Sequence, residues 1–514
     1  MTSARTPMPP GAGNSGDQAA WYGHDGPVNR SKDRELAGAL ADAATDPDPA
    51  RTALVMARLA GLSGPGWLRL DESARRPYAG QSPLGKVADW RKTLAAGDTP
   101  AGVVAESMCR DGRLREAAVA ALARTPGPVA AAALAVRAAD WVPAVSSAAS
   151  AALADRTGPG DAAAVIPVLL ALGHRRRGRQ AAAGYLASIA AGPAAVLEAL
   201  AAPGDRARQL WALDVLASKS LLATDVLAAR AMRDPDPVVA LWCARSLVSA
   251  DDGLPPETGR QLLGSARAGV RAFAAGHLGD DQLTIRALRG LLLDRSGAVR
   301  SVARWRWRRQ YGDPGPVYRA VLRGPTRPRQ LAAALQGLDD DHDNSLPAAA
   351  VPFLSHPNPA VRRAAAQAIG RHADADGIQY HLVPLLLDSS GKVAATALRH
   401  VRGHALPATV LATLDAAGTA PSRRIALSIR QHSGTWNRVH ADLAAINGHD
   451  ADLAEAARTD LLAWLQHGAA TSYGKPSPAQ ATQIAGLLAT GELSQQQRRE
   501  VAFVAGIRLP ATES

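Results

Sequence analysis

Few residues of this chain combine the types and the spacing that catalysis requires. Gly11, Gly13 and Gly16 spell GxGxxG, but no expected strand precedes them and no expected helix follows, as a phosphate-binding loop requires. Ser472 and Lys475 spell SxxK, the spacing of an acyl-enzyme nucleophile and its base, in an expected loop instead of a helix start. The chain contains neither HExxH nor a P-loop. The sequence therefore predicts a protein that is not an enzyme.

Metal and thiol chemistry have equally weak signals. Three His-Asp dipeptides stand in polar segments, where solvated or capping roles are the usual ones: His24-Asp25, His342-Asp343 and His449-Asp450. Cys109 and Cys243 form neither a CxxC motif nor a disulfide framework, and we expect both thiols to be reduced and buried. The sequence predicts no metal, no cofactor and no small-molecule substrate.

The chemistry that the sequence does offer is recognition of an acid by arginine. The net charge is +12, and only six of the 58 basic residues are lysine. Codon bias in a GC-rich genome would favour arginine over lysine but does not explain the excess of positive charge. Arg300, Arg304 and Arg308 share a helix face by their i, i+4, i+8 spacing. The candidate basic surface comprises Arg175, Arg176, Arg177, Arg179, Arg300, Arg304, Arg308 and Arg309.

A secondary candidate site interleaves aromatic and basic residues among glycines and prolines. Its members are Trp67, Arg75, Arg76, Tyr78 and Trp90. Aromatic rings beside cations stack on nucleic-acid bases or grip a peptide. The alternative interpretation is an irregular repeat near the start of a repeat array.

A recurring sequence template identifies the elements that must position these residues. The segment that begins Asp234-Pro235-Asp236-Pro237 and the segment that begins His356-Pro357-Asn358-Pro359 share one pattern, and Asp46 and Asp140 begin it again. Each segment opens like a helix, because Asp or Asn caps unpaired N–H groups and proline fits the first turn.

The sixth position of this template serves as an anchor that recurs at regular intervals. After a first gap of 63 residues, the anchors follow one another at 29 to 33 residues. Four residues past each anchor stands a small or β-branched residue, and eight past it an apolar one, except at Arg430. The anchors are Arg51, Leu114, Val145, Gly178, Arg208, Val239, Val270, Val299, Gln330, Val361, Val393, Ser422 and Leu453.

This period describes a repeat of two helices. Positions i, i+4 and i+8 lie along one helix face, and the middle one must be small where neighbouring helices approach closely. A second apolar helix, often with a proline, fills the rest of each repeat, as residues 166–172 show. With only 4% aromatic residues, the chain suits stacked helices better than sheets. We predict an all-α fold, an α-solenoid or armadillo-type superhelix of about 14 helix pairs.

The DPxPxVRxxAxxAL pattern resembles that of HEAT repeats, particularly the short form related to phycobilisome-lyase-type repeats. The resemblance covers residues 33–467. It implies a scaffold that presents binding surfaces, because few branches of the family are enzymes. Metal-dependent hydroxylases built on such repeats carry paired His-Glu dipeptides, and no histidine here precedes a glutamate.

Domain organisation follows from the same repeats. We expect a disordered polar tail at 1–32, the repeat array at 33–467 with an irregular repeat or insertion at 63–100, a Gly/Pro/Ser loop at 468–479, and capping helices at 480–514. The N-terminus lacks the apolar segment of a secretory signal, and the longest apolar run is too short to span a bilayer. We therefore expect a cytoplasmic protein that does not insert into membranes.

Arginine also recurs directly after the anchor. It stands there at Arg115, Arg179, Arg271, Arg300, Arg362 and Arg423, and none of the other anchors is followed by an acid. The resemblance to HEAT repeats implies a structural role, in which each arginine bonds to the Asp that opens a neighbouring repeat. We favour that role for this arginine ladder and a binding role for the arginines of residues 295–329.

The sequence thus predicts a non-enzymatic scaffold or adaptor whose arginine-rich surface binds an acidic protein or a nucleic acid. A nucleic-acid partner would show steep salt dependence, and a protein partner a shallower one. The alternative function is a HEAT-like DNA glycosylase for alkylated bases. That family holds DNA on a basic surface with Trp and an Asp, and this chain has ten Trp but no local motif that matches.

Overall fold

A computed structural model describes residues 30–45, 48–75, 99–173, 176–248, 253–343, 345–402, 406–472, 474–490 and 492–508. These residues form α-helices and short 3-10 turns, with no β-strand among them. The predicted all-α class is confirmed. The expected tail at 1–32 and much of the irregular segment 63–100 fall outside the described residues, although the first helix already begins at Arg30.

The chain divides into two compact units, residues 1–282 and 283–514, a division that the regular repeat pattern does not predict. The helices of the first unit are α2 (Arg30–Thr45), α3 (Pro49–Ala60), α4 (Gly64–Arg75), α6 (Pro100–Ser107), α7 (Gly112–Arg124), α8 (Pro128–Ala138), α9 (Pro143–Ala154), α10 (Pro159–Leu172), α11 (Arg176–Ala191), α12 (Ala194–Ala201), α13 (Arg206–Ser218), α14 (Thr224–Arg233), α15 (Pro237–Arg245), α16 (Pro256–Leu262) and α17 (Ala268–His277).

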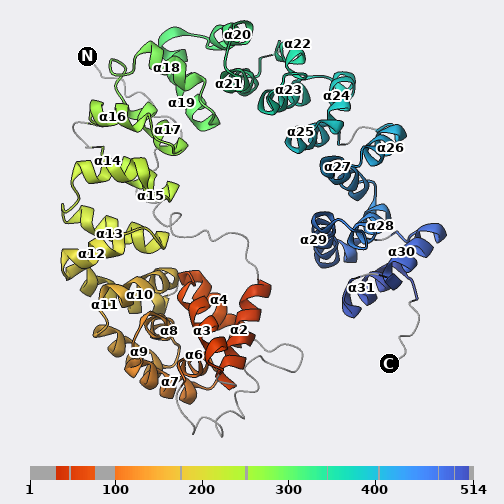
Figure 1. The fold of residues 1–514 in the computed structure, drawn as a ribbon. Coiled ribbons are helices and arrows are strands. Elements are labelled where there is room, and N and C mark those ends of the chain that lie inside the picture. Colours follow the sequence, from red (N-terminus) through yellow and green to blue (C-terminus); the bar gives the residue numbers. More distant parts are fainter. Residues whose placement is uncertain are drawn as a thin grey trace. The chain divides into compact units, whose positions relative to one another are not determined.

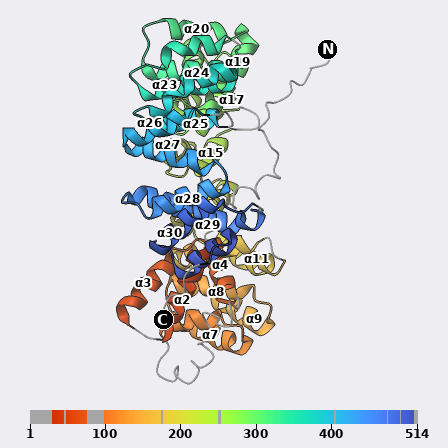
Figure 2. The ribbon, with the colours of Figure 1, turned by 90° about the vertical axis from the view of Figure 1, so that its right-hand side faces the viewer.

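The second unit continues the alternation. Its helices are α18 (Ile285–Leu292), α19 (Gly297–Tyr311), α20 (Gly315–Arg323), α21 (Pro328–Asp340), α22 (Leu346–Ala350), α23 (Pro359–His372), α24 (Ala375–Leu382), α25 (Gly391–Val401), α26 (Ala408–Ala417), α27 (Ala420–Gln431), α28 (Thr435–Ile446), α29 (Ala451–His467), α30 (Pro478–Thr490) and α31 (Gln495–Ala505). Within it, α19, α21, α23, α25 and α27 form one layer and α18, α20, α22, α24 and α26 the other (Figure 1). In a view turned by 90°, α25, α27, α28 and α30 follow one another in chain order (Figure 2).

The template residues start helices as the sequence predicts. Asp236 caps α15, and its carboxylate accepts the N–H groups of Val238 and Val239 at 2.8 and 3.3 Å. Asn358 caps α23 by accepting the N–H of Ala360 at 2.9 Å. In both helices proline occupies the first turn, where its missing N–H leaves no bond unmade.

The predicted packing face is buried at most of its positions. All thirteen residues four past the anchors are buried, and so are the residues eight past them, except Leu186 and Arg430. The anchor Gly178 shows how tight this contact is, because a Cβ there would overlap the carbonyl oxygen of Leu172. Small residues on this face therefore let neighbouring helices approach closely.

The described helices were compared with the length and apolarity of a membrane span. No single described helix has both the length and the apolarity that crossing a bilayer requires. Only together do α11 and α12 have this length and apolarity, and the two helices are bent by 113° at the break between them.

Candidate binding surface

The arginine ladder connects successive repeats. Arg115 forms a bidentate ion pair with Asp140, with Nε–Oδ2 and Nη2–Oδ1 distances of 2.9 Å each. Its Nη1 also donates to the carbonyl oxygens of Cys109 and Arg110, at 3.0 and 2.7 Å, in the loop that precedes its own helix. Asp140 in turn accepts the N–H of Val142 at 3.0 Å. One guanidinium thus fixes two loops, an arrangement that we call the Arg–Asp clip.

The same clip recurs in both units. Arg362 pairs with Asp388 at 2.7 and 2.8 Å, and Arg423 pairs with Asp450 at 3.1 and 2.7 Å. At a further junction Gln209 takes the arginine's place and donates to Asp234 at 2.8 Å. Burial alone would raise the pKa of Asp388, but hydrogen bonds from Arg362 and the Ser390 N–H hold that pKa below its ordinary value. The structural role of the ladder is confirmed at Arg115, Arg362 and Arg423.

The face of Arg300, Arg304 and Arg308 is not an open basic surface. The residues Arg300 and Arg304 are only 4% and 8% exposed. Arg300 donates to Asp340 through Nε and Nη2, at 3.1 and 2.8 Å, and Arg304 donates to the same oxygen at 2.9 Å. The expectation that this face is available to a partner is therefore wrong for Arg300 and Arg304.

The acid that these arginines bind belongs to the same chain. It is the run Asp339-Asp340-Asp341-His342-Asp343 at the end of α21, which we call the acidic turn. Arg308 is paired with Asp341, and Arg319 with Asp343. Asp339 accepts Arg371 and His372 at 3.0 and 2.9 Å. His342-Asp343 thus belongs to a turn, as expected, since Asp343 accepts the Ser345 N–H at 2.9 Å.

Arg309 lies over an aromatic ring of its own helix. Its guanidinium carbon lies 5.3 Å from the ring centre of Trp305, whose side chain is 37% exposed at the surface of α19. Such a stacked pair stabilises the helix surface weakly.

The other predicted arginine cluster lies at an exposed edge of the first unit. Arg175 lies outside the described residues, whereas Arg176, Arg177 and Arg179 are exposed on the first turn of α11. The Nη1 of Arg177 donates to the carbonyl oxygen of Trp141 at 2.7 Å. This bond ties the start of α11 to the loop before α9, and so places the arginines of α11 beside Trp141.

Trp141 is the functional candidate that the sequence reasoning missed. It is 61% exposed, and the guanidinium carbons of Arg115 and Arg75 lie 5.0 and 5.4 Å from its ring centre. Beneath it, the buried Asp140 also pairs with Arg137 at 3.0 Å, and Arg137 pairs with Asp71. The available signal was an aromatic residue at the template position that Pro235 and Pro357 occupy in other repeats. An exposed Trp held on guanidinium groups presents an open ring surface for a partner.

The start of α7 completes this edge. Gly112 approaches the loop of Trp141 so closely that a Cβ there would lie 3.3 Å from Cγ2 of Val142. The adjoining Arg113 is exposed, and no carboxylate of the described residues lies within ion-pair distance of Arg113, Arg176 or Arg179. The acids nearby on α7 are Asp111, which caps the helix, and Glu116. We call the exposed set Arg113, Trp141, Arg176, Arg177 and Arg179 the Trp141 edge.

The structure separates the two described members of the secondary candidate. Arg75 belongs with Trp141, whereas Trp67 is only 2% exposed and lines a pocket against α8, α10 and α13. Arg76, Tyr78 and Trp90 lie outside the described residues. Trp67 and Arg75 therefore do not share one surface.

Reactive groups elsewhere are buried. Burial raises the pKa of the Cys109 thiol to about 11 and that of Cys243 to about 12, which leaves both thiols protonated near neutrality. Asp442, fully buried in the second unit, accepts Gln431 at 2.7 Å and lies beside Asp460. Among the described residues, no three His, Cys, Asp or Glu side chains gather in a metal-binding group.

Comparison with known proteins adds little to these observations. No protein-family model and no curated protein matches the chain. A solved Kap95:Nup1 complex is similar at 12% identity and a TM-score of 0.28, over 93% of this chain and 66% of that one. The karyopherin Kap121p bound to the extreme C-terminus of the protein phosphatase Cdc14p is similar at 11% and 0.21, over 95% and 52%. The chain thus spans about half to two thirds of the length of these proteins, and TM-scores this low carry no conclusion about function.

Proposed function

We propose that this protein is a non-enzymatic scaffold that binds an acidic partner through the Trp141 edge. The observation that carries the proposal is the contrast between its exposed arginines, which have no acid of the described residues to pair with, and the arginines of α19, which do. Exposed guanidinium groups with unused donors bind carboxylates or phosphates, often in a bidentate manner. We further propose that it acts in the cytoplasm.

The partner is an acidic protein segment or a nucleic acid, and Trp141 suits either. A ring that is 61% exposed stacks on a nucleic-acid base or covers an apolar side chain beside acidic residues. Salt dependence separates the two. On a single strand, removing one arginine–phosphate interaction lowers the log-log salt slope by about 0.7, whereas an acidic protein binds more weakly mainly because it associates more slowly.

The test replaces Arg113, Arg176 and Arg179 by Gln together, and Trp141 by Ala separately. Binding of the full chain to a labelled oligothymidylate and to a labelled polyglutamate peptide is followed by fluorescence anisotropy. We expect both variants to weaken binding to one of the two probes. For the oligothymidylate, the salt slope of the triple variant falls by up to about 2 units.

The matched control replaces three exposed arginines of α18 and α20, Arg286, Arg289 and Arg323, by Gln. This control removes the same charge from another part of the chain. If both triple variants bind equally well, net charge and not the Trp141 edge attracts the partner, and the proposal fails. A pull-down from the native cell extract, with and without nuclease, then identifies the natural partner class.

The glycosylase alternative has one observation in its favour. The pocket of Trp67 contains an Asp, Asp205, as removal of an alkylated base by that family requires. However, Asp205 caps α13 and accepts the Arg208 N–H at 3.0 Å, so this carboxylate already has a structural role. Release of free modified base from alkylated duplex, abolished in Asp205→Asn, would support the alternative. Unchanged duplex would reject it.

A further inference from the structure

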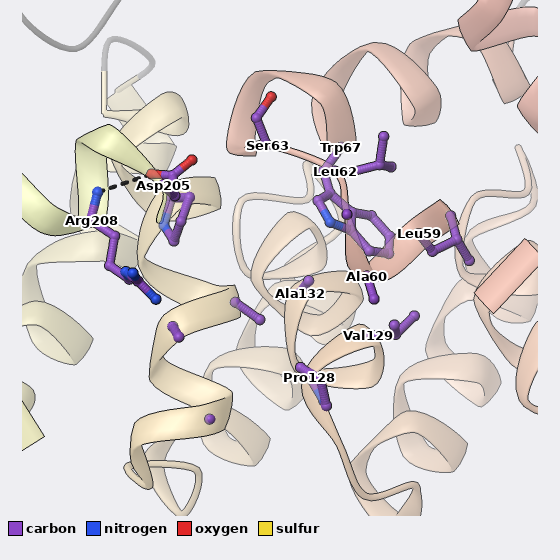
Figure 3. A pocket seen from close by; sticks show the side chains of 15 residues that line it. Leu59, Ala60, Leu62, Ser63, Trp67, Pro128, Val129, Ala132, Asp205 and Arg208 are labelled. Carbon is purple, nitrogen blue, oxygen red and sulfur yellow. Dashed lines mark hydrogen bonds between the residues drawn. The ribbon is translucent and has the colours of Figure 1, made fainter. Parts of the chain in front are cut away.

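A pocket in the first unit lies apart from the Trp141 edge and has no part in the proposed function. Its volume is about 380 Å³, within the range of small-molecule sites. Leu59, Leu62 and Trp67 form one wall, and the start of α13, with Asp205 and Arg208, forms the facing wall (Figure 3). The start of α8 and the middle of α10 lie between them. The lining is mostly apolar.

The indole of Trp67 has an unused hydrogen-bond donor at this pocket. The residue is 98% buried, since only 2% of its surface is exposed, and it lines the pocket. No hydrogen bond of its Nε1–H is made to the part of the chain that the structure describes. Buried Trp N–H groups usually find an acceptor. A ligand oxygen in the pocket would supply one.

Arg208 contributes a partly desolvated guanidinium from the facing wall. Its guanidinium donates to the carbonyl oxygen of Ala202 at 2.8 Å, and its Nε is enclosed by protein atoms without an acceptor. Burial lowers the pKa of Arg208, and the charge of Asp205 opposes that effect. Asp205 lies beyond ion-pair distance of the guanidinium, because it is bonded to the backbone of α13. The guanidinium therefore has a desolvation cost that an anion would offset.

A proline inside α10 lies at the pocket wall. Pro167 lies inside α10 and lines the pocket, and its missing N–H leaves the carbonyl of Ala163 without its usual helical donor. Gly64 at the start of α4 packs directly on the Pro167 carbonyl, where a Cβ would overlap it. This close approach fixes Trp67 and Arg208 on opposite walls, because α4 and α13 both pack against α10.

We propose that this pocket binds a small carboxylic acid with an apolar body and a second oxygen acceptor. The carboxylate pairs with Arg208, the apolar body contacts Leu62 and Val129, and the second oxygen accepts the Trp67 N–H. Both walls offer donors, so a ligand with acceptors at its two ends satisfies them. The pocket would hold about a dozen waters at ~30 Å³ each, which matches a molecule of roughly ten heavy atoms.

The test uses the full chain labelled with ¹⁵N at its tryptophan indoles. The Trp67 signal is assigned by its disappearance in Trp67→Phe, and three probes are titrated: monomethyl suberate, octanoate and 1-octanol. We expect monomethyl suberate to shift the Trp67 signal at lower concentration than octanoate, and 1-octanol to act only weakly. Because Arg208→Gln removes a hydrogen bond to a charged group, it weakens binding of both carboxylates about 10- to 100-fold and leaves 1-octanol unchanged.

A pocket-filling variant keeps the test independent of Arg208. Gly160 lines the pocket, and a Cβ there would meet nothing within 4 Å, so Gly160→Leu fills the space without backbone strain. Gly158→Leu is the matched control, because Gly158 is equally open but does not line the pocket. We expect the first to abolish binding of monomethyl suberate, as measured by calorimetry, and the second to leave it intact.

Two results overturn the proposal. One is the absence of any shift of the Trp67 signal up to about 10 mM monomethyl suberate. The other is binding that survives in both Arg208→Gln and Gly160→Leu. Binding should also be unaffected when Arg113, Arg176 and Arg179 are all replaced by Gln, so failure here is distinguishable from failure of the Trp141 edge.

Discussion

Two arginine-rich regions that look alike in the sequence have opposite environments in the fold. In α19, Arg300 and Arg304 are buried, and Asp340 alone binds both of them. The arginines at the start of α11 are exposed, and Arg177 among them donates to a carbonyl oxygen in the loop of Trp141 instead of a carboxylate. A cluster of arginines therefore indicates a binding surface only where the fold leaves its donors unused.

The difference arises from distant acids. The carboxylates that satisfy α19 lie 33 to 40 residues further along the chain, on the helix of the next repeat. A local count of charges over residues 295–329 does not include them, although the acidic turn begins only ten residues later. In a repeat array, the partner of a charged helix face must be sought one period away.

Replacing Asp340 by Ala gives the largest expected effect on this comparison. It leaves the guanidinium groups of Arg300 and Arg304 without their shared carboxylate, and breaking a buried pair in this way costs about 3 to 5 kcal/mol. Urea unfolding followed by circular dichroism measures the decrease. Asp313→Ala is the control, because Asp313 is exposed and its contact with Arg319, at 3.8 Å, is long for an ion pair. Equal stability of the two variants would contradict the buried network.

The two arginine triplets should then respond differently to neutralisation. Changing Arg300, Arg304 and Arg308 to Gln removes buried ion pairs, and we expect a decrease of about 3 kcal/mol in the free energy of unfolding. Changing Arg113, Arg176 and Arg179 removes exposed side chains, and each should change stability by less than about 0.5 kcal/mol. Thermal melts of the two triple variants provide the measurement. Destabilisation of both would mean that the Trp141 edge is structural too.

The smallest effect concerns Asp442, a buried acid that lies beside a second acid, Asp460. Burial raises the pKa of Asp442 to about 8, the adjacent Asp460 adds to the increase, and Gln431 and Arg438 oppose it. Between about pH 4 and pH 8 the folded chain keeps a proton that the unfolded chain releases, so the contribution of Asp442 to stability falls as pH rises through this window.

Asp442→Asn should remove this dependence. The difference in melting temperature, variant minus wild type, should therefore grow from pH 5 to pH 8, and Asp415→Asn at an exposed position serves as the control. A difference that stays constant across this range would mean that Asp442 is ionised in the folded chain.

Much of the fold follows from the sequence, and less of the site does. Period, caps and the small residue four past each anchor predict the helices and their packing face, because these are local properties that every repeat restates. The exposure of Trp141 depends on which side of a loop faces solvent. The burial of Arg300 depends on Asp340 in the next repeat. The pocket of Trp67 arises where α4 packs on α10, a contact between helices far apart in the chain.

The Arg–Asp clip also has a mechanical consequence. Arg362 joins its repeat to the repeat that Asp388 opens, and Arg423 joins its repeat to the repeat that Asp450 caps. At the junction between these two clips, the residue after the anchor is Ala394, which cannot form the ion pair. In the first unit, Arg115 forms a clip, whereas Ser146, the residue after the next anchor, cannot form this ion pair. The clips thus fasten some junctions between repeats and leave others without an ion pair at this position. Under tension, we expect a junction without a clip, such as that of Ala394, to separate before its clipped neighbours.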